Sequence, residues 1–138
     1  VRIVATDISN VVLERGREGV FSELEIVRGL PQPLLTKYFH PFQSNWSITQ
    51  SCRQLVEFRQ LNLTDIWPIM MPYDIVFLRN VLLYFDTKTR GEVLEKMARA
   101  IPPDGALFLG GAETMLGLNS GYERLTGKGC SYYRPEQS

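Results

Sequence analysis

Three residues that could carry chemistry follow an apolar segment in the middle of the chain. Residues 73–78 (YDIVFL) are nearly all apolar, and Arg79 and Asn80 come directly after them. An arginine beside a buried strand is disfavoured unless its charge is paired. Its guanidinium could hold a carboxylate through two parallel hydrogen bonds, or it could form a salt bridge with Asp86 at a helix start. The residue types alone do not decide between these two roles of Arg79. Tyr84 follows at a spacing that could bring its hydroxyl back over the strand ends.

Further candidates lie at the ends of two other predicted strands. Asp7 ends the first strand, and Asn62 and Leu63 end the strand over 55–63. A carboxylate just past a parallel strand commonly accepts hydrogen bonds from ribose hydroxyls, and its alternative role is that of a helix-capping or loop aspartate. The Asn62 amide can donate and accept hydrogen bonds, as recognition of an adenine edge requires. Taken alone, Asn62 is more simply interpreted as a turn residue.

Several kinds of catalytic site are excluded by the residue counts. His40 is the only histidine, and its HPF context is turn-like, so we interpret it as structural. One histidine with the distant Cys52 and Cys130 cannot complete a zinc site, and the sequence has no nucleophile elbow and no P-loop. Two cysteines this far apart also make no disulfide framework, which is typical of a reducing compartment.

Composition sets the broad class of the protein. The chain has 138 residues, of which 44% are hydrophobic and 22% charged, enough for one globular domain. Lys and Arg together number 15, as do Asp and Glu, so the net charge is zero and binding to nucleic acid by phosphate neutralisation is not expected. No apolar run approaches the roughly 20 residues of a membrane span. We therefore expect a cytoplasmic protein without nucleic-acid partners or membrane insertion.

The elements that must position the candidates alternate between strand and helix. Strands are predicted over 2–8, 46–50, 55–63, 73–78 and 106–110, with a C-terminal hairpin over 122–125 and 131–133. Helices are predicted between Ser9 and Gly19, over 31–39, over 87–101 and near 113–118, with turns or loops at 40–45 and 67–72. The apolar strand 73–78 should be covered on both faces. This order predicts an α/β sheet with crossover connections and an antiparallel tail.

Four parts of the chain carry the motifs of one enzyme family. They are ATDIS at 5–9 with VLERGREG at 12–19, FRQLNL at 58–63, FLRNVLLYFD at 77–86, and PDGALFLG at 103–110 with Glu113 and Thr114. The third closely matches the hallmark F-C-R-N-V-x-I-Y-F-D of the CheR-type chemotaxis receptor methyltransferases, with Leu78 in place of the usual cysteine. The chain resembles this family over essentially its whole length.

The resemblance implies both a fold and an activity. The fold is α/β, with a Rossmann-like methyltransferase sheet that is mostly parallel and has antiparallel C-terminal strands. The activity is S-adenosylmethionine-dependent methylation of glutamate side chains on the cytoplasmic domain of chemoreceptors, with S-adenosylhomocysteine as the product. The site residues it implies are Asp7 at the cofactor ribose, Asn62 and Leu63 at the adenosine, Arg79 and Asn80 along the cofactor, and Tyr84 near the transferring methyl group.

This chemistry agrees with the residues that the sequence lacks. A glutamate carboxylate is a nucleophile at neutral pH and a sulfonium is a good leaving group, so the enzyme has only to align them and exclude water. Arg79 and Tyr84 are the candidate catalytic residues, and either could hold the acceptor or the cofactor.

The start of the chain suggests a fragment. Val1 already lies in an apolar run, so we expect 1–138 to be a partial methyltransferase domain that lacks the family's first strand and helix. Because that strand and a glycine-containing loop hold the methionine end of the cofactor, we expect weak or no cofactor binding by the isolated chain. The incomplete sheet could also allow self-association. The segment 39–57 corresponds to the family's small inserted β-subdomain, which docks a receptor tail peptide in some members, but here it has no obvious match.

Two other functions stay open at this point. The first is a non-catalytic binding or regulatory module with a degenerate methyltransferase fold. The second is a nicotinamide-dependent dehydrogenase, because an acidic residue at a strand end also suits that ribose. The residues at 79–85 and the antiparallel C-terminal strands argue against the dehydrogenase.

Overall fold

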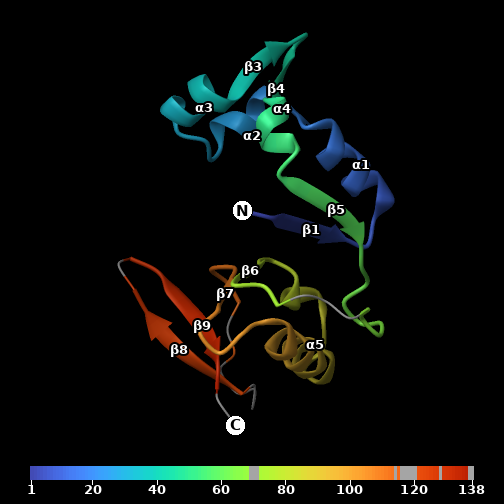
Figure 1. Ribbon diagram of the computed structural model, residues 1–138, viewed down its shortest axis with the longest axis vertical. Helices are drawn as coiled ribbons and strands as arrows, with labels where there is room; N and C mark the ends of the chain where they lie inside the picture. Colours follow the sequence, from blue (N-terminus) through green and yellow to red (C-terminus); the bar gives the residue numbers. More distant parts are fainter. Residues whose placement is uncertain (69–71, 114, 116–120, 128, 137–138) are drawn as a thin grey trace. The chain divides into compact units, whose positions relative to one another are not determined.

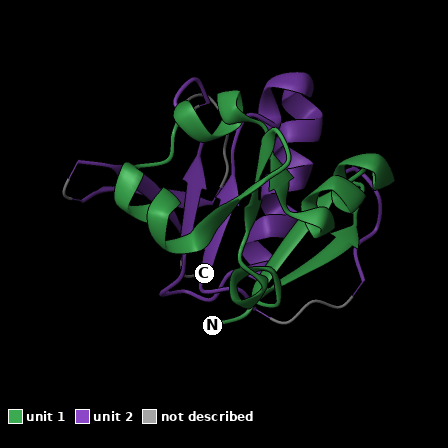
Figure 2. Ribbon diagram, turned by 90° about the horizontal axis from the view of Figure 1, so that it is seen from above, with its two compact units in different colours: residues 1–62 green, residues 63–138 purple. Residues whose placement is uncertain are grey.

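The computed structural model describes residues 1–68, 72–113, 115, 121–127 and 129–136. The chain forms two compact units, residues 1–62 and residues 63–138, which Figure 2 shows in different colours. Each unit combines strands with helices (Figure 1), so the α/β class predicted from the sequence is confirmed.

The first unit is built on a parallel pair of strands. β1 (Ile3–Asp7) pairs with β5 (Val56–Gln60), and the register runs from Ile3 opposite Val56 to Asp7 opposite Gln60. Both strands lie within segments predicted as strands. Their carboxyl ends therefore meet at one edge, where ligands bind in parallel sheets.

Helix α1 (Asn10–Glu18) connects these strands and begins and ends where the sequence predicts. The Ser9 hydroxyl accepts a hydrogen bond from the backbone N–H of Val12, and Gly19 ends the helix in the left-handed conformation, with φ of 64°. Leu13 is the buried side chain of the helix. Gly16 allows close approach to β5, because a Cβ there would collide with the Phe58 ring.

The rest of the first unit surrounds a small antiparallel sheet. Its strands lie in the order β2-β4-β3, where β2 is Val20–Phe21, β3 is Phe39–Phe42 and β4 is Asn45–Ile48. Three short helices accompany it: α2 (Glu23–Val27), α3 (Gln32–Tyr38) and α4 (Gln50–Arg53). The helix predicted over 31–39 is confirmed, and the strand predicted over 46–50 is confirmed as far as Ile48. Gln50 begins α4 instead, and the sequence left α2 and the rest of α4 unassigned.

The turn predicted over 40–45 is wrong for its first half. His40, Pro41 and Phe42 belong to β3 and pair with β4, which leaves the reversal to Gln43 and Ser44. Pro41 has no N–H to donate, yet β3 is an edge strand of its sheet, where a proline is tolerated.

The second unit has a mixed four-stranded sheet. Its order is β6-β7-β9-β8, formed by β6 (Ile75–Leu78), β7 (Ala106–Leu109), β8 (Tyr122–Thr126) and β9 (Ser131–Pro135). β6 and β7 are parallel, and β9 is antiparallel to both of its neighbours. The predicted C-terminal hairpin and antiparallel tail are confirmed. The helix predicted near 113–118 falls mostly outside the described residues, as do three residues of the loop predicted at 67–72.

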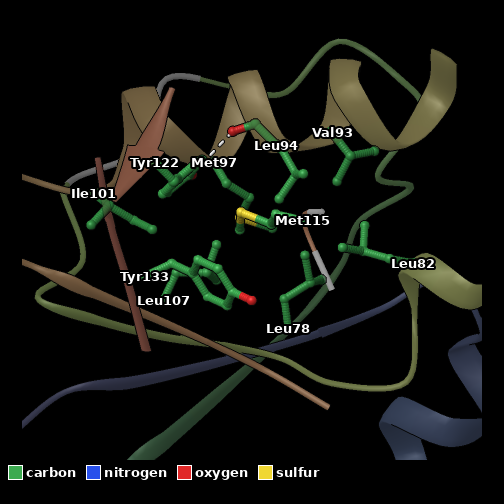
Figure 3. Close-up of a cluster of buried hydrophobic side chains, with 10 residues drawn as sticks. All are labelled: Leu78, Leu82, Val93, Leu94, Met97, Ile101, Leu107, Met115, Tyr122 and Tyr133. Atoms are coloured by element: carbon green, nitrogen blue, oxygen red, sulfur yellow. Dashed lines mark hydrogen bonds between the residues drawn. The ribbon is translucent and has the colours of Figure 1, made fainter. Parts of the chain in front are cut away.

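Helix α5 (Thr87–Ala100) covers one face of this sheet. Asp86 begins it by accepting a hydrogen bond from the Thr89 N–H at 2.8 Å, and the two prolines at 102–103 follow its end. Figure 3 shows its side chains packed against those of the strands, with the Tyr122 hydroxyl donating to the Leu94 carbonyl at 3.1 Å. The buried cluster consists of Leu78, Leu82, Val93, Leu94, Met97, Ile101, Leu107, Met115, Tyr122 and Tyr133.

The opposite face of β6 differs from the expectation. Val76 and Leu78 lie against the buried cluster, whereas Ile75 and Phe77 are 58% and 70% exposed. Phe77 stacks instead on Phe108 of the neighbouring strand, with ring centroids 5.2 Å apart. Burial on both faces, predicted from the apolar run, is therefore found on one face only.

In the described ranges, no helix is both long and apolar enough to cross a membrane. Cys52 and Cys130 are free thiols.

Removing a fully buried side chain should destabilise the second unit. Leu107 has no exposed surface, so Leu107→Ala is expected to lower the free energy of unfolding by about 2–5 kcal/mol. Ile66 is 98% exposed and is the control: Ile66→Ala should change the free energy of unfolding by less than about 0.5 kcal/mol. Urea denaturation measures both, and equal effects of the two variants would contradict the assigned core.

Candidate functional site

The carboxyl edge of the first unit brings two predicted site residues together. Asp7 ends β1, and Asn62 follows the end of β5 by two residues. The backbone N–H of Leu61 donates to the Asp7 carbonyl at 3.0 Å, which continues the pairing beyond the strands. Both Asp7 and Asn62 are partly buried. A carboxylate and an amide therefore share one edge of the parallel pair.

The Asp7 side chain also has a local structural role. Its Oδ1 accepts a hydrogen bond from the Ser9 N–H at 2.8 Å, in the turn that leads into α1. This is the loop-aspartate role weighed from the sequence. It does not exclude ligand binding, because a carboxylate offers about four lone-pair sites and this contact uses one.

The predicted pair of Asn62 and Leu63 is divided between the two units. Leu63 begins the second unit, and its side chain packs against the buried cluster there. Its carbonyl accepts hydrogen bonds from the Trp67 indole, at 3.2 Å, and from the Lys96 ammonium. Leu63 thus has a clear packing role within its own unit.

The carboxyl edge of the second unit carries the other three candidates. Arg79 and Asn80 follow β6, and Tyr84 ends the short 3-10 helix η1 (Leu82–Tyr84). The Arg79 side chain is exposed, as is Tyr84 at 83%. In the part of the chain that the structure describes, Arg79 forms no ion pair, and Asp86 instead caps α5. The salt bridge between Arg79 and Asp86, one of the two alternatives from the sequence, is therefore wrong.

A carboxylate that the sequence did not single out for the site organises this edge. Glu113 lies just after β7, which is parallel to β6, so it reaches the same end of the sheet. Its Oε1 accepts hydrogen bonds from the N–H groups of Val81 and Leu82, each at 2.8 Å. Its Oε2 accepts from those of Asn80, at 2.6 Å, and Gly110, at 2.7 Å. We call these four contacts the Glu113 clasp.

Two neighbouring residues allow the clasp to close. Asn80 has a φ of 58°, the left-handed conformation that asparagine tolerates better than most residues. Gly110 is buried, and a Cβ there would lie 2.6 Å from Oε2 of Glu113 and 2.7 Å from Oδ1 of Asn80. Any larger residue at position 110 would therefore push against the carboxylate.

The clasp favours the ionised form of Glu113. Burial by itself raises the pKa of this carboxyl, but the backbone hydrogen bonds of Asn80, Gly110, Val81 and Leu82 outweigh burial, so the pKa lies below its ordinary value of 4.5. At neutral pH the clasp is thus a charged acceptor held by four neutral donors.

The arrangement suits binding and orientation better than proton transfer. The edge of the first unit offers a carboxylate and an amide, groups that can hold a nucleoside. The edge of the second unit, taken by itself, offers a guanidinium and a phenol, groups that can hold a carboxylate. Among the described residues, no three His, Cys, Asp or Glu side chains are grouped as metal ligands.

Comparison with known proteins assigns the chain to a family. Residues 1–129 match the family model described as CheR methyltransferase, SAM binding domain. The chain belongs to this family. The resemblance inferred from the sequence motifs is confirmed.

Curated relatives of this CheR-family chain are chemotaxis methyltransferases. The chemotaxis protein methyltransferase Cher2 of Pseudomonas putida is 39% identical over 123 residues, which are 88% of this chain and 45% of that protein. A chemotaxis protein methyltransferase of Vibrio parahaemolyticus is also 39% identical, over 89% of this chain and 45% of its own length. Chemotaxis protein methyltransferase 2 of Vibrio cholerae is 32% identical over 99% of this chain and 49% of its own length. The chain spans about half the length of these relatives.

The Glu113 clasp should make stability depend on pH in one direction. Because the pKa of Glu113 is lower in the folded chain, its contribution is complete above the unfolded value near 4.5 and is lost as pH falls through the folded value. Glu113→Gln should therefore lower the free energy of unfolding most at neutral pH, with a difference from wild type that shrinks below about pH 4.5.

Denaturation series from about pH 7 to about pH 3 would measure this difference. Glu123→Gln removes the same charge from an exposed position on β8 and should change the free energy of unfolding by less than about 0.5 kcal/mol at neutral pH. A difference between wild type and Glu113→Gln that stays constant with pH would contradict the clasp.

Proposed function

We propose that this chain is part of a methyltransferase that uses S-adenosylmethionine to methylate glutamate side chains on the cytoplasmic domain of chemoreceptors, in the cytoplasm. The observation that carries the proposal is the match of residues 1–129 to the CheR SAM-binding family. The names of the curated relatives, all chemotaxis protein methyltransferases, support the same activity.

The first unit fits the nucleoside part of the cofactor. The Asp7 carboxylate lies at the carboxyl end of a parallel strand, where such groups accept hydrogen bonds from ribose hydroxyls. The Asn62 amide, at the same edge, can donate to and accept from the adenine. The next residue, Leu63, which begins the second unit, is proposed to add an apolar contact to the adenosine. A carboxylate acceptor suits the hydroxyls of an uncharged nucleoside and would repel a phosphate.

The second unit fits the charged groups of the reaction. The cofactor supplies an activated methyl group on a sulfonium, which a glutamate carboxylate can take up without a general base. Arg79 has no ion pair in the described part of the chain, so its guanidinium is available to hold a carboxylate through two hydrogen bonds. Tyr84 can donate from its exposed hydroxyl. We assign Arg79 and Tyr84 as catalytic residues and Asn80 to the cofactor.

The small antiparallel sheet has a separate role in this proposal. Most of it lies in the segment 39–57, which we propose to be the inserted β-subdomain of a partial methyltransferase domain over 1–138. Its strands form a sheet separate from the parallel pair that carries Asp7, and we propose that this sheet contacts the protein substrate.

Removing the Asp7 charge should weaken cofactor binding. Asp7→Asn retains an oxygen for the Ser9 contact, so the local turn should persist while the ribose loses its charged acceptor. We expect the affinity for S-adenosylhomocysteine to fall about 10-fold, as charge-assisted hydrogen bonds warrant. Calorimetry on the gene product that carries this chain measures it. Asp104→Asn, an exposed control, should bind as wild type does, and equal binding by Asp7→Asn would contradict the assignment.

Methyl transfer itself can be followed with labelled cofactor. The gene product that carries this chain should transfer a radiolabelled methyl group to a chemoreceptor cytoplasmic domain as an ester, which mild base releases as methanol. Arg79→Lys keeps the charge but loses the planar guanidinium, and should lower kcat/KM by about 10-fold or more. Tyr84→Phe tests the hydroxyl in the same assay.

Three results would decide between the candidate functions. Base-stable label would indicate methylation of nitrogen and contradict glutamate as the acceptor. Binding of S-adenosylhomocysteine without any transfer would favour the non-catalytic module. Unchanged transfer by both Arg79→Lys and Tyr84→Phe would contradict their assignment as catalytic residues.

A further inference from the structure

We propose that Glu113 is a positioning residue for the methyl-transfer site and holds the segment 79–84 in the conformation that presents Arg79 and Tyr84. This inference rests on the proposed function, because the segment acts in catalysis only if it contacts the cofactor or the acceptor. Glu113 need not contact either of them, since both of its oxygens already accept two backbone hydrogen bonds each.

The backbone at this edge forms an anion-binding concavity that the chain fills itself. Asn80 is left-handed and Val81 is in the right-handed helical region, with φ of −117° and ψ of −46°. Successive N–H groups in such an alternation converge on one point and bind anions. Here that point is occupied by the Glu113 carboxylate at 2.6 to 2.8 Å. The concavity is therefore a device for fixing the segment and is not open to a ligand anion.

Besides the clasp, apolar packing holds the middle of this segment, because Val81 and Leu82 both lie against the buried cluster. Leu82 is 2% exposed, and Figure 3 shows it at the margin of the buried cluster. Arg79, Asn80 and Tyr84 are exposed. Without the clasp, this packing would still hold Val81 and Leu82, but the Asn80 N–H would lose the described hydrogen bond that fixes its left-handed backbone.

Substitution of Glu113 tests this role directly. In Glu113→Gln, one of the two acceptor oxygens is replaced by an NH₂ group, which is itself a donor. Two of the four backbone N–H groups therefore face a donor and lose their acceptor. In the gene product that carries this chain, we expect kcat/KM for methyl transfer to fall on the order of 10- to 100-fold, because small displacements of positioning groups have effects of this size.

The Michaelis constant separates positioning from stability. A merely destabilised protein contains fewer active molecules, which lowers kcat and leaves the KM for S-adenosylmethionine unchanged. A displaced segment 79–84 should raise that KM and weaken S-adenosylhomocysteine binding by about 10-fold. Tyr122→Phe removes the buried hydrogen bond to Leu94, away from this segment, and is the control for stability alone. It should leave KM unchanged, as should the charge control Glu123→Gln.

A second variant reaches the same carboxylate from the opposite side. Gly110→Ala places a methyl group 2.6 Å from Oε2 of Glu113, so it should displace the carboxylate without removing its charge. If both substitutions act through the clasp, their effects on affinity should not add in the double variant. Additive effects would overturn the shared mechanism.

The outcomes distinguish this inference from the proposed function. If the wild-type protein neither binds S-adenosylhomocysteine nor transfers methyl groups, the proposed function fails, and the positioning role fails with it. If wild type is active and Glu113→Gln has an unchanged KM and affinity, only the positioning role is overturned. A raised KM in Glu113→Gln, with the wild-type KM in both controls, supports the positioning role.

Discussion

The second unit depends on one partly buried electrostatic interaction, the acceptance of four backbone N–H groups by the Glu113 carboxylate. Two parallel strands, β6 and β7, end side by side, and each leaves donors at its carboxyl end that the sheet no longer satisfies. A single carboxylate satisfies donors from both ends. It thereby joins the residues after β6 to the residues after β7 and sets the path of the segment that carries Arg79 and Tyr84.

In the first unit, too, side-chain oxygens accept hydrogen bonds from backbone N–H groups that the strand and helix leave without a partner, although fewer donors are involved. The Asp7 carboxylate accepts from the Ser9 N–H, and the Ser9 hydroxyl accepts from the Val12 N–H, so the exit of β1 and the start of α1 are fixed together. Each unit thus has an acidic residue at the carboxyl end of a parallel strand. Asp7 uses one hydrogen bond and stays available for a ligand, whereas the Glu113 carboxylate is filled by the chain itself.

Much of the fold could be predicted because its signals are local. Ser9 and Gly19 delimit α1, Asp86 and the prolines at 102–103 delimit α5, and apolar runs mark β1, β6 and β7. Elements without such a signal were missed or misassigned. The HPF sequence at β3 looks like a turn, because nothing local shows that the strand lies at a sheet edge, where Pro41 costs no hydrogen bond.

The candidate site shows the same limit. Asp7 and Arg79 were recognisable because their types are unusual at the ends of apolar strands, and the family motif named Asn80 and Tyr84. The role of Glu113 could not be predicted, because its partners are backbone N–H groups, which every residue except proline has. The contact with Asn80 also spans 33 positions in the sequence. The signals were the presence of Glu113 in the family motif and its position three residues after Gly110, which follows a buried strand.

Nuclear magnetic resonance of the backbone amides tests the clasp most directly. As pH is lowered, the amide proton shifts of Asn80, Val81, Leu82 and Gly110 should change together with one midpoint below 4.5, the ordinary pKa of a glutamate. In Glu113→Gln that common transition should be absent. Separate midpoints for the four amides, or a transition that persists in Glu113→Gln, would show that the Glu113 carboxylate does not hold this edge of the sheet.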